Sequence, residues 1–198
     1  MHNSVMDVHA RIQTFLQQRS VVALPYSAPL PDGHYTKAGV IPFIRADPTL
    51  YYMMKPVAKR PGLGAPDFQI GKGTRMEFVG GEWVDMREAG VIGDERETLV
   101  MSALREGIEE LGLKLDTIKT LYDAGPYQFA SSNTGAPKYM WLFAAEMTSR
   151  DMLADAEIEP STAERGWLTL ADFMIAGRED HRYILTDIAS KLETHAPR

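Results

Sequence analysis

The sequence contains no cysteine in its 198 residues. Disulfides, thiolate zinc sites and cysteine nucleophiles are therefore excluded. Runs of lysine and arginine are also missing, and the formal net charge is −6. The chain consequently has no electrostatic footprint for the backbone of a nucleic-acid polymer. A protein of this charge that handles anions must do so locally, for example through a bound metal ion.

Long apolar segments are scarce as well. The longest, "YMWLFAA" at 139–145, is far too short to span a bilayer. The segment "MHNSVMDVHARIQTFLQQRS" lacks the uninterrupted apolar core of a signal peptide. We therefore expect a cytoplasmic protein that has neither a membrane nor a nucleic-acid polymer as its partner.

The remaining composition is that of a globular protein, with 44% hydrophobic and 24% charged residues. Its length fits one sizeable domain. Val5, Val8, Ile12 and Phe15 have the mixed three and four spacing of an amphipathic helix. We expect residues 1–20 to form a helical extension, packed on the main domain or on a second subunit of a homodimer. Residues 21–198 would form the main domain.

The rest of the chain alternates between strand and helix patterns. Apolar runs predict strands at 38–44, 50–58, 120–129 and 138–147, and Gly80-Gly81 predicts a hairpin over 76–86. Periodicity predicts helices at 94–111, followed by Gly112 in a capping position, and at 181–195. This order predicts an α/β fold with helices on both faces of one sheet.

The helix at 94–111 carries a crowded acidic face. At about 100° per residue, Glu109 and Glu110 lie within roughly 60° of Glu106, on the side opposite the apolar residues. Three carboxylates on one turn repel one another. The ordinary interpretation is a solvated acidic face. A divalent cation would instead reverse the repulsion, and an oxygen-rich cluster favours Mg²⁺ or Mn²⁺ over zinc.

The same segment resembles the Nudix box, G-x5-E-x7-R-E-U-x-E-E-x-G-U, in which U is a bulky aliphatic residue. Glu97 is followed by seven residues and then by "REGIEELGL" at 105–113. Two positions depart from the pattern. Gly107 replaces an aliphatic residue, which would permit close packing of the helix, and Val91 stands where the first glycine is expected.

A better candidate for the first glycine lies upstream, in "FQIGKGTR" at 68–75. There Gly73 would open the box, and the hairpin around "VGGEWVD" would be an insertion before Glu97. An ordinary turn at Gly71 and Gly73 is the alternative. Glu97 falls on the apolar side of a regular helix and has capping-box spacing from Asp94. We therefore expect Glu97 to cap the helix first and to reach a metal site only through water.

The resemblance implies a Nudix-type α/β/α sandwich with a mixed central sheet, extended by the N-terminal helix and the inserted hairpin. It also implies Mg²⁺-dependent or Mn²⁺-dependent hydrolysis of a diphosphate bond in a nucleoside diphosphate that is linked to another moiety. The small-molecule substrate would be a nucleotide sugar, a dinucleoside polyphosphate or a similar compound.

The same resemblance assigns roles to individual residues. Glu106, Glu109 and Glu110 would be metal ligands, and Glu106 would also orient or deprotonate the attacking water. Arg105 would hold the helix against the glycine-containing loop, where Lys72 and Gly73 would meet the substrate. Glu164 in "AERGWLTL" resembles the late Glu-x-x-Trp segment of the family, which makes it a candidate general base. An exposed loop acid is the alternative there.

Two other functions share this fold. Isopentenyl diphosphate isomerases use a catalytic cysteine, which this chain lacks. A catalytically inactive Nudix-like nucleotide-binding or regulatory domain stays possible, although such domains usually lose box carboxylates and this chain retains them. The five histidines have no mutual ligand spacing, so we expect them at the surface or with satisfied partners in the core.

Overall fold

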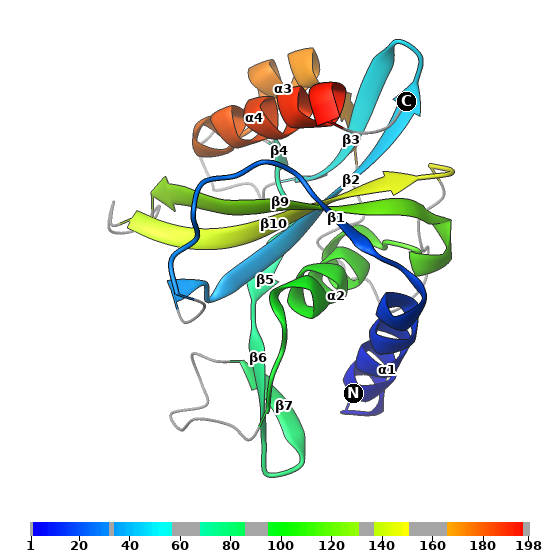
Figure 1. Cartoon of the computed structure of the whole chain (residues 1–198), viewed down its shortest axis with the longest axis vertical. Helices are drawn as coiled ribbons and strands as arrows, with labels where there is room; N and C mark the ends of the chain where they lie inside the picture. The colour runs from blue at the N-terminus through cyan, green and yellow to red at the C-terminus, as the bar shows by residue number, and fades with distance from the viewer. Residues whose placement is uncertain are drawn as a thin grey trace.

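The computed structural model describes residues 2–31, 34–56, 68–85, 95–130, 137–150 and 166–195. Within these ranges a mixed sheet lies between two layers of helices (Figure 1). Its main path runs in the order β1 (Val21–Ala23), β9 (Ile118–Ala130), β10 (Pro137–Met147), β2 (Lys37–Ala46), β3 (Thr49–Pro56) and β11 (Gly166–Thr169). The pairs β1/β9 and β10/β2 are parallel, and the other neighbours are antiparallel. The predicted α/β sheet with helices on both faces is confirmed.

Two short strands branch from this path and reach the region of the acidic face. The strand β4 (Phe68–Gln69) pairs with β3, and β5 (Lys72–Thr74) pairs with β2. One helical layer holds α1 (His2–Gln18) and α2 (Leu99–Leu111), and the other holds α3 (Leu170–Ala176) and α4 (Glu179–His195) (Figure 1).

Strict alternation along the central strands fills both cores. In β10, Trp141, Phe143 and Ala145 join the cluster under α1 and α2, while Met140 and Leu142 join the cluster under α4. Successive strand side chains point to opposite faces, so each strand supplies apolar residues to both layers. The sheet is therefore covered on both sides.

The N-terminal helix is packed on this domain. Val8 and Ile12 of α1 are 4% and 0% exposed and belong to the cluster that contains Met101 and Leu104 of α2. This is the first of the two expected placements for the helix. The boundary at residue 20 and the homodimer stay predictions.

The hairpin before the acidic helix is confirmed. Strands β6 (Met76–Val79) and β7 (Glu82–Asp85) are joined through Gly80 and Gly81, whose φ angles are 61° and 94°. Positive φ at both central residues is the condition for a tight two-residue hairpin turn. The hairpin points away from the main sheet and lies beside α1 (Figure 1).

The predicted start of the acidic helix at residue 94 was wrong. Glu95–Arg96 form a short strand, β8, that pairs with β6, and α2 begins at Leu99 with Thr98 as its N-cap. The Thr98 side chain accepts from the backbone N–H of Met101 at 3.3 Å. The inserted hairpin supplies backbone partners for residues 95–96, so these residues extend the small sheet instead of the helix. Asp94 lies outside the described residues.

The end of α2 is confirmed. Gly112 has φ 67° and donates its N–H to Ile108 O at 3.0 Å, as expected of a left-handed cap.

Glycine at position 107, where the family pattern has an aliphatic residue, has a steric reason. A β-carbon there would lie 2.5 Å from Val40 Cγ1 of β2. The missing side chain lets α2 approach the sheet closely.

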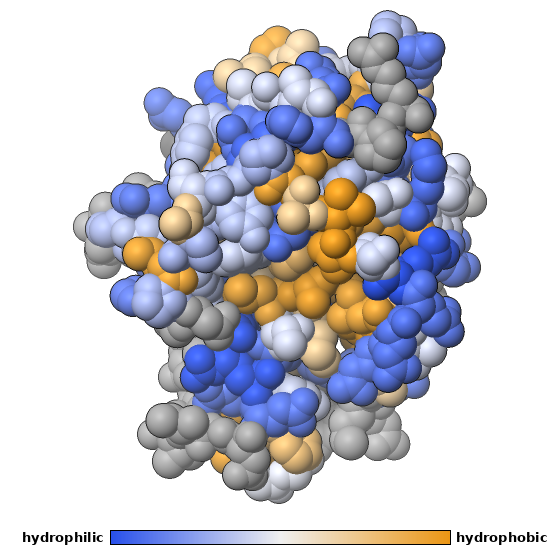
Figure 2. All heavy atoms as spheres, viewed as in Figure 1, coloured by the Kyte–Doolittle hydropathy of each residue, from blue (hydrophilic) through white to orange (hydrophobic). Residues whose placement is uncertain are grey.

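On the face shown in Figure 2, an apolar area lies at the place where β1 crosses in front of the sheet in Figure 1. Val21 and Val22 of β1 are each 38% exposed.

Across the described ranges, none of the helices has the length and apolar character that a membrane crossing requires.

Candidate active site

The helix α2 presents one apolar and one acidic face, as its spacing predicted. Ala103, Leu104 and Ile108 are 0% exposed and face the core. On the other side Glu106 is only 8% exposed, and its neighbour Arg105 is 2% exposed. A solvated acidic face would leave these groups in water, so that interpretation fails for Glu106 and Arg105.

Arg105 is the centre of the acidic face. Its Nη1 donates to Glu106 Oε1 at 2.8 Å and to Glu109 Oε2 at 2.7 Å, and its Nη2 donates to the backbone carbonyl of Thr74 at 2.8 Å. Its Nε donates to Glu97 Oε1 at 2.8 Å. Burial lowers the pKa of Arg105, but the bond and charge of Glu97 outweigh this effect, so the guanidinium stays charged. The Thr74 contact joins Arg105 of α2 to β5.

Glu97 does not cap the helix, which corrects the role inferred from its spacing. It is 0% exposed and precedes the N-cap residue Thr98. Its Oε2 accepts from the Met76 N–H at 2.8 Å, and its Oε1 accepts from Arg105. Burial alone would raise the pKa of Glu97, but the hydrogen bonds from His9 and Arg105 hold it below its ordinary value. The helical-phase argument failed because the helix does not extend back to this residue.

Gly73 lies directly against the acidic face. A β-carbon at this position would fall 2.0 Å from the carboxylate of Glu106. Gly73 is the middle residue of β5, whose neighbour Lys72 donates its backbone N–H to Glu110 Oε2 at 2.9 Å. The strand that the sequence proposed as the opening of the box is thus packed on the carboxylates of α2.

Glu110 also has a partner that the sequence did not identify. Lys55 Nζ, from β3, lies 2.5 Å from Glu110 Oε1. In the sequence, Lys55 stands out as a charged residue directly after the apolar run "LYYMM" at 50–54. Lysine is rarely buried without a charged partner, so this position could have been singled out.

The side chain of Lys72 points to α4. Its Nζ lies 3.2 Å from Nε2 of His181 and 5.6 Å above the ring of Phe129. Burial, with the charges of Arg178 and Lys37, lowers the pKa of Lys72 to about 8. Nδ1 of His181 accepts from the Ile70 N–H at 3.1 Å. Burial and Lys72 lower the pKa of His181 to about 3, so its ring is neutral. His181 is a core histidine with satisfied partners, as expected, but it also lies beside this site.

The electrostatics of Glu106 follow from its surroundings. Burial raises the pKa of Glu106 to about 7, and the charges of Glu110 and Glu109 act in the same direction, while Arg105 opposes them. A carboxyl with this pKa is partly protonated near neutral pH. An added divalent cation would stabilise its charged form.

The donor set fits an oxygen-ligated divalent cation in its chemistry, and the missing side chain of Gly73 makes room for the Glu106 carboxylate against β5. The side chains are nevertheless turned toward cations, Glu106 and Glu109 to Arg105 and Glu110 to Lys55. Within the ranges that the structure describes, no three aspartate, glutamate or histidine side chains converge closely enough to hold a metal. Binding a cation would therefore require these side chains to turn toward one another.

Some candidates lie elsewhere. Glu164, the candidate general base, lies outside the described residues. Tyr122 and Tyr127 are 0% and 7% exposed and belong to the core under α4. His9 and Trp83 had no signal in the sequence, because His9 meets Glu97, and Trp83 meets His9, only through the tertiary fold.

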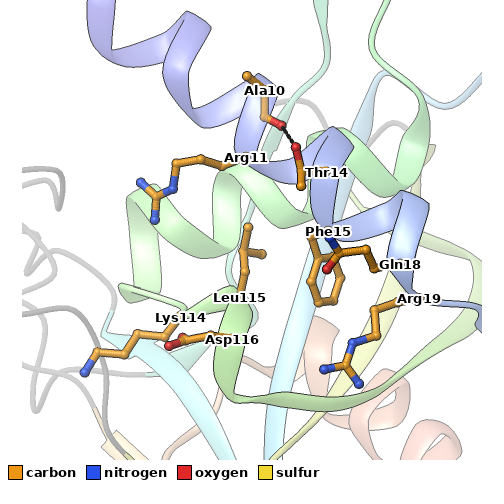
Figure 3. A pocket seen from close by; sticks show the side chains of 9 residues that line it. All are labelled: Ala10, Arg11, Thr14, Phe15, Gln18, Arg19, Lys114, Leu115 and Asp116. Atoms are coloured by element: carbon orange, nitrogen blue, oxygen red, sulfur yellow. Dashed lines mark hydrogen bonds between the residues drawn. The ribbon is translucent and has the colours of Figure 1, made fainter.

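A groove of about 740 Å³ lies apart from the acidic face, between α1 and the 3₁₀ turn Leu115–Thr117 (Figure 3). Its lining contains none of the candidate site residues. The residues that line it are Ala10, Arg11, Thr14, Phe15, Gln18, Arg19, Lys114, Leu115 and Asp116. Pocket size alone therefore does not identify the candidate active site.

Comparison with known proteins assigns the fold. No protein-family model and no curated protein sequence matches the chain. Among solved structures, an Ap4A hydrolase of C. elegans in a binary complex is similar with a TM-score of 0.53 and 14% identity, over 79% of this chain and 96% of that one. The Nudix domain of NrtR from Shewanella oneidensis, complexed with ADP ribose, has a TM-score of 0.53 and 15% identity over 84% and 94%.

The same NrtR complexed with a 27mer DNA is similar with a TM-score of 0.52 and 14% identity, over 79% of this chain and 61% of that one. At these identities the likeness concerns the fold. The chain has the Nudix fold, and the α/β/α architecture expected from the box at 97–113 is confirmed.

Proposed function

We propose that this protein is a Nudix hydrolase that cleaves a diphosphate bond in a nucleoside diphosphate linked to another moiety, with Mg²⁺ or Mn²⁺ as cofactor. The observation that carries the proposal is the packing of β5 on α2. It brings Gly73 against the carboxylate of Glu106 and the backbone of Lys72 against Glu110. The Nudix fold supports the substrate class, and so do two similar structures, an Ap4A hydrolase and a Nudix domain complexed with ADP ribose.

The proposed roles follow from these positions. Glu106, Glu109 and Glu110 would hold the cation, which would neutralise phosphate oxygens and lower the pKa of a bound water. Arg105 fixes the carboxylates through its bonds to Glu106 and Glu109.

Positive groups beside the carboxylates would bind the anionic substrate. Lys55 lies at Glu110 through its side chain, and Lys72 brings its backbone N–H to Glu110 and its side-chain ammonium to His181. Gly73 would serve the site by leaving room for the Glu106 carboxylate against the backbone of β5. A general base beyond Glu106 would be supplied by Glu164.

A panel of diphosphates tests this function. Ap4A, ADP-ribose and a nucleotide sugar are incubated with Mg²⁺ or with a chelator, and the products are identified by mass spectrometry. We expect Mg²⁺-dependent release of a nucleoside monophosphate from at least one compound. Glu109→Gln and Glu110→Gln should reduce the rate about 100-fold or more, because charge stabilisation by a metal contributes several kcal/mol. Glu193→Gln makes the same chemical change on the exposed side of α4 and should leave the rate unchanged.

One observation favours a second candidate, a Nudix-like nucleotide-binding domain without catalysis. In the folded protein, Glu106 and Glu109 pair with Arg105, and Glu110 pairs with Lys55. The three carboxylates do not converge on one point where a cation could bind. The same panel separates the two functions. Tight binding of ADP-ribose by calorimetry, without turnover of any compound in Mg²⁺ or Mn²⁺, would establish the binding domain and reject the hydrolase.

A further inference from the structure

His9 connects the N-terminal helix to the candidate active site. It lies on α1 and is 4% exposed. Its Nε2 is 2.7 Å from Glu97 Oε1. Its ring stacks on Trp83 of the inserted hairpin, with centroids 4.4 Å apart and an interplanar angle of 1°. Two segments outside the α2 and β5 pair, α1 and the hairpin, thus meet at Glu97.

The bond from His9 acts on the oxygen that also holds Arg105. An ionised carboxylate only accepts hydrogen bonds, so Nε2 of His9 is the donor. Glu97 Oε1 therefore accepts from both His9 and Arg105 Nε, the latter at 2.8 Å. Because Glu97 is fully buried, water does not replace a lost donor.

Arg105 carries this constraint to the acidic face. Its Nη1 donates to Glu106 and Glu109, at 2.8 Å and 2.7 Å. The planar guanidinium has its five donors in a fixed geometry. A displacement at Nε therefore also moves the Nη1 bonds, and the two carboxylates follow.

We propose that His9 is a positioning residue for the carboxylates of α2, acting through Glu97 and Arg105, and that Trp83 holds its ring in place. The proposal rests on the proposed function, since the carboxylates that it positions are the cation ligands of that function. It assigns α1 and the inserted hairpin a role in the site. Partners of metal ligands typically change metal affinity or activity about 10-fold to 100-fold when they are lost.

Three variants of the full chain test this role. His9→Leu removes the donor, His9→Gln keeps an N–H at a similar reach, and Val8→Ala is the matched control on the same helix, since Val8 is also 4% exposed and packs in the cluster around α2. The measurements are kcat and KM on the best panel substrate, Mg²⁺ affinity by calorimetry without substrate, and water exchange of the Arg105 Nε–H by NMR.

We expect His9→Leu to weaken Mg²⁺ binding and lower kcat by about tenfold, with little change in KM. The Arg105 Nε–H should exchange faster in this variant. His9→Gln should restore most of both properties, and Val8→Ala should retain them despite its lower stability. If His9→Leu does not fold, Trp83→Leu replaces it and should give the same effects to a smaller extent.

Failure of the inference and failure of the proposed function give different results. A wild-type protein that neither binds Mg²⁺ nor turns over any diphosphate rejects both. A wild-type protein that is active, with His9→Leu equal to Val8→Ala in Mg²⁺ affinity, kcat and exchange, rejects the role of His9 alone.

Discussion

At the residue scale, the candidate site depends on the absence of a side chain at Gly73. The carboxylate of Glu106 fills the space that a β-carbon would take, at 2.0 Å. Real atoms do not approach so closely, so any side chain at residue 73 must displace either β5 or Glu106. Arg105 holds Glu106 at 2.8 Å on one side, which limits its freedom to move away.

Gly73→Ala should therefore disable catalysis more than it destabilises the fold. We expect kcat to fall about tenfold or more, because a misplacement of about 1 Å near the reacting groups can cost as much as 100-fold. The measurement is steady-state hydrolysis of the best panel substrate.

Gly71→Ala is the matched control two residues away. The three atoms nearest to its β-carbon would all belong to the side chain of Leu111, with Cδ1 at 3.0 Å. Overpacking against Leu111 should lower stability by about 1–3 kcal/mol and leave kcat nearly unchanged in the folded fraction. Equal loss of kcat in both variants would contradict a specific role for Gly73.

Spacing in the sequence predicted the position of some site residues but not of others. Helix periodicity placed Glu106, Glu109 and Glu110 on one face, because all three lie on one regular turn. Lys55 and His181 belong to other elements, and only the sheet and α4 bring them to this site. No spacing in the sequence records such contacts.

At the element scale, α1 is part of the core and not an appendage. Ile12 is 0% exposed and packs in the cluster formed with α2 and the sheet. The helix also supplies His9 to Glu97. Its amphipathic pattern predicted a buried face, while the surface that covers this face became known only from the fold.

Ile12→Ala should lower the free energy of unfolding by about 2–4 kcal/mol, from lost burial and the remaining cavity. Ile175→Ala makes the same substitution on α3, where the side chain is 81% exposed. It should change the free energy of unfolding by less than about 0.5 kcal/mol. Urea denaturation measures both. An unaltered midpoint for Ile12→Ala would show that α1 does not fold with the domain.

Also at the element scale, the sequence pattern predicted the end of the acidic helix but not its start. Its end was predicted correctly because Gly112 marks the left-handed cap within the local sequence. Its start was predicted five residues too early, at 94 instead of Leu99. The inserted hairpin pairs with Glu95–Arg96 through the backbone, and backbone pairing over this separation leaves no side-chain pattern.

At the scale of the whole molecule, the buried and neutral ring of His181 makes the stability of the fold depend on pH. His181 begins the buried face of α4, accepts from Ile70 and lies beside Lys72 of β5. Its pKa is lowered from 6.5 to about 3 in the folded protein. The unfolded state thus binds more protons between these values, so stability rises with pH and is lost as pH falls below about 6.5.

His181→Asn should flatten the pH dependence of stability, because asparagine still accepts from Ile70 but does not titrate. We expect the free energy of unfolding of the wild type to fall more steeply than that of the variant between pH 6.5 and 4.5, by up to about 1.4 kcal/mol per pH unit. Urea denaturation across this range measures both.

Glu106 contributes in the opposite direction in this experiment. Its pKa is raised from 4.5 to about 7, so it favours the folded state as pH falls. This contribution is common to both proteins and cancels in their difference. Parallel curves would show that His181 does not remain neutral in the fold.

The sequence by itself determined the fold class, the hairpin at Gly80-Gly81 and the acidic face of α2. These features depend on periodicity and turn chemistry, which are local properties of the chain. Only the tertiary structure decided that Glu97 is buried under His9, that Lys55 meets Glu110 and that Gly73 faces Glu106. Those contacts join residues that are distant in the chain, and they exist only once the sheet has set the positions of its neighbours.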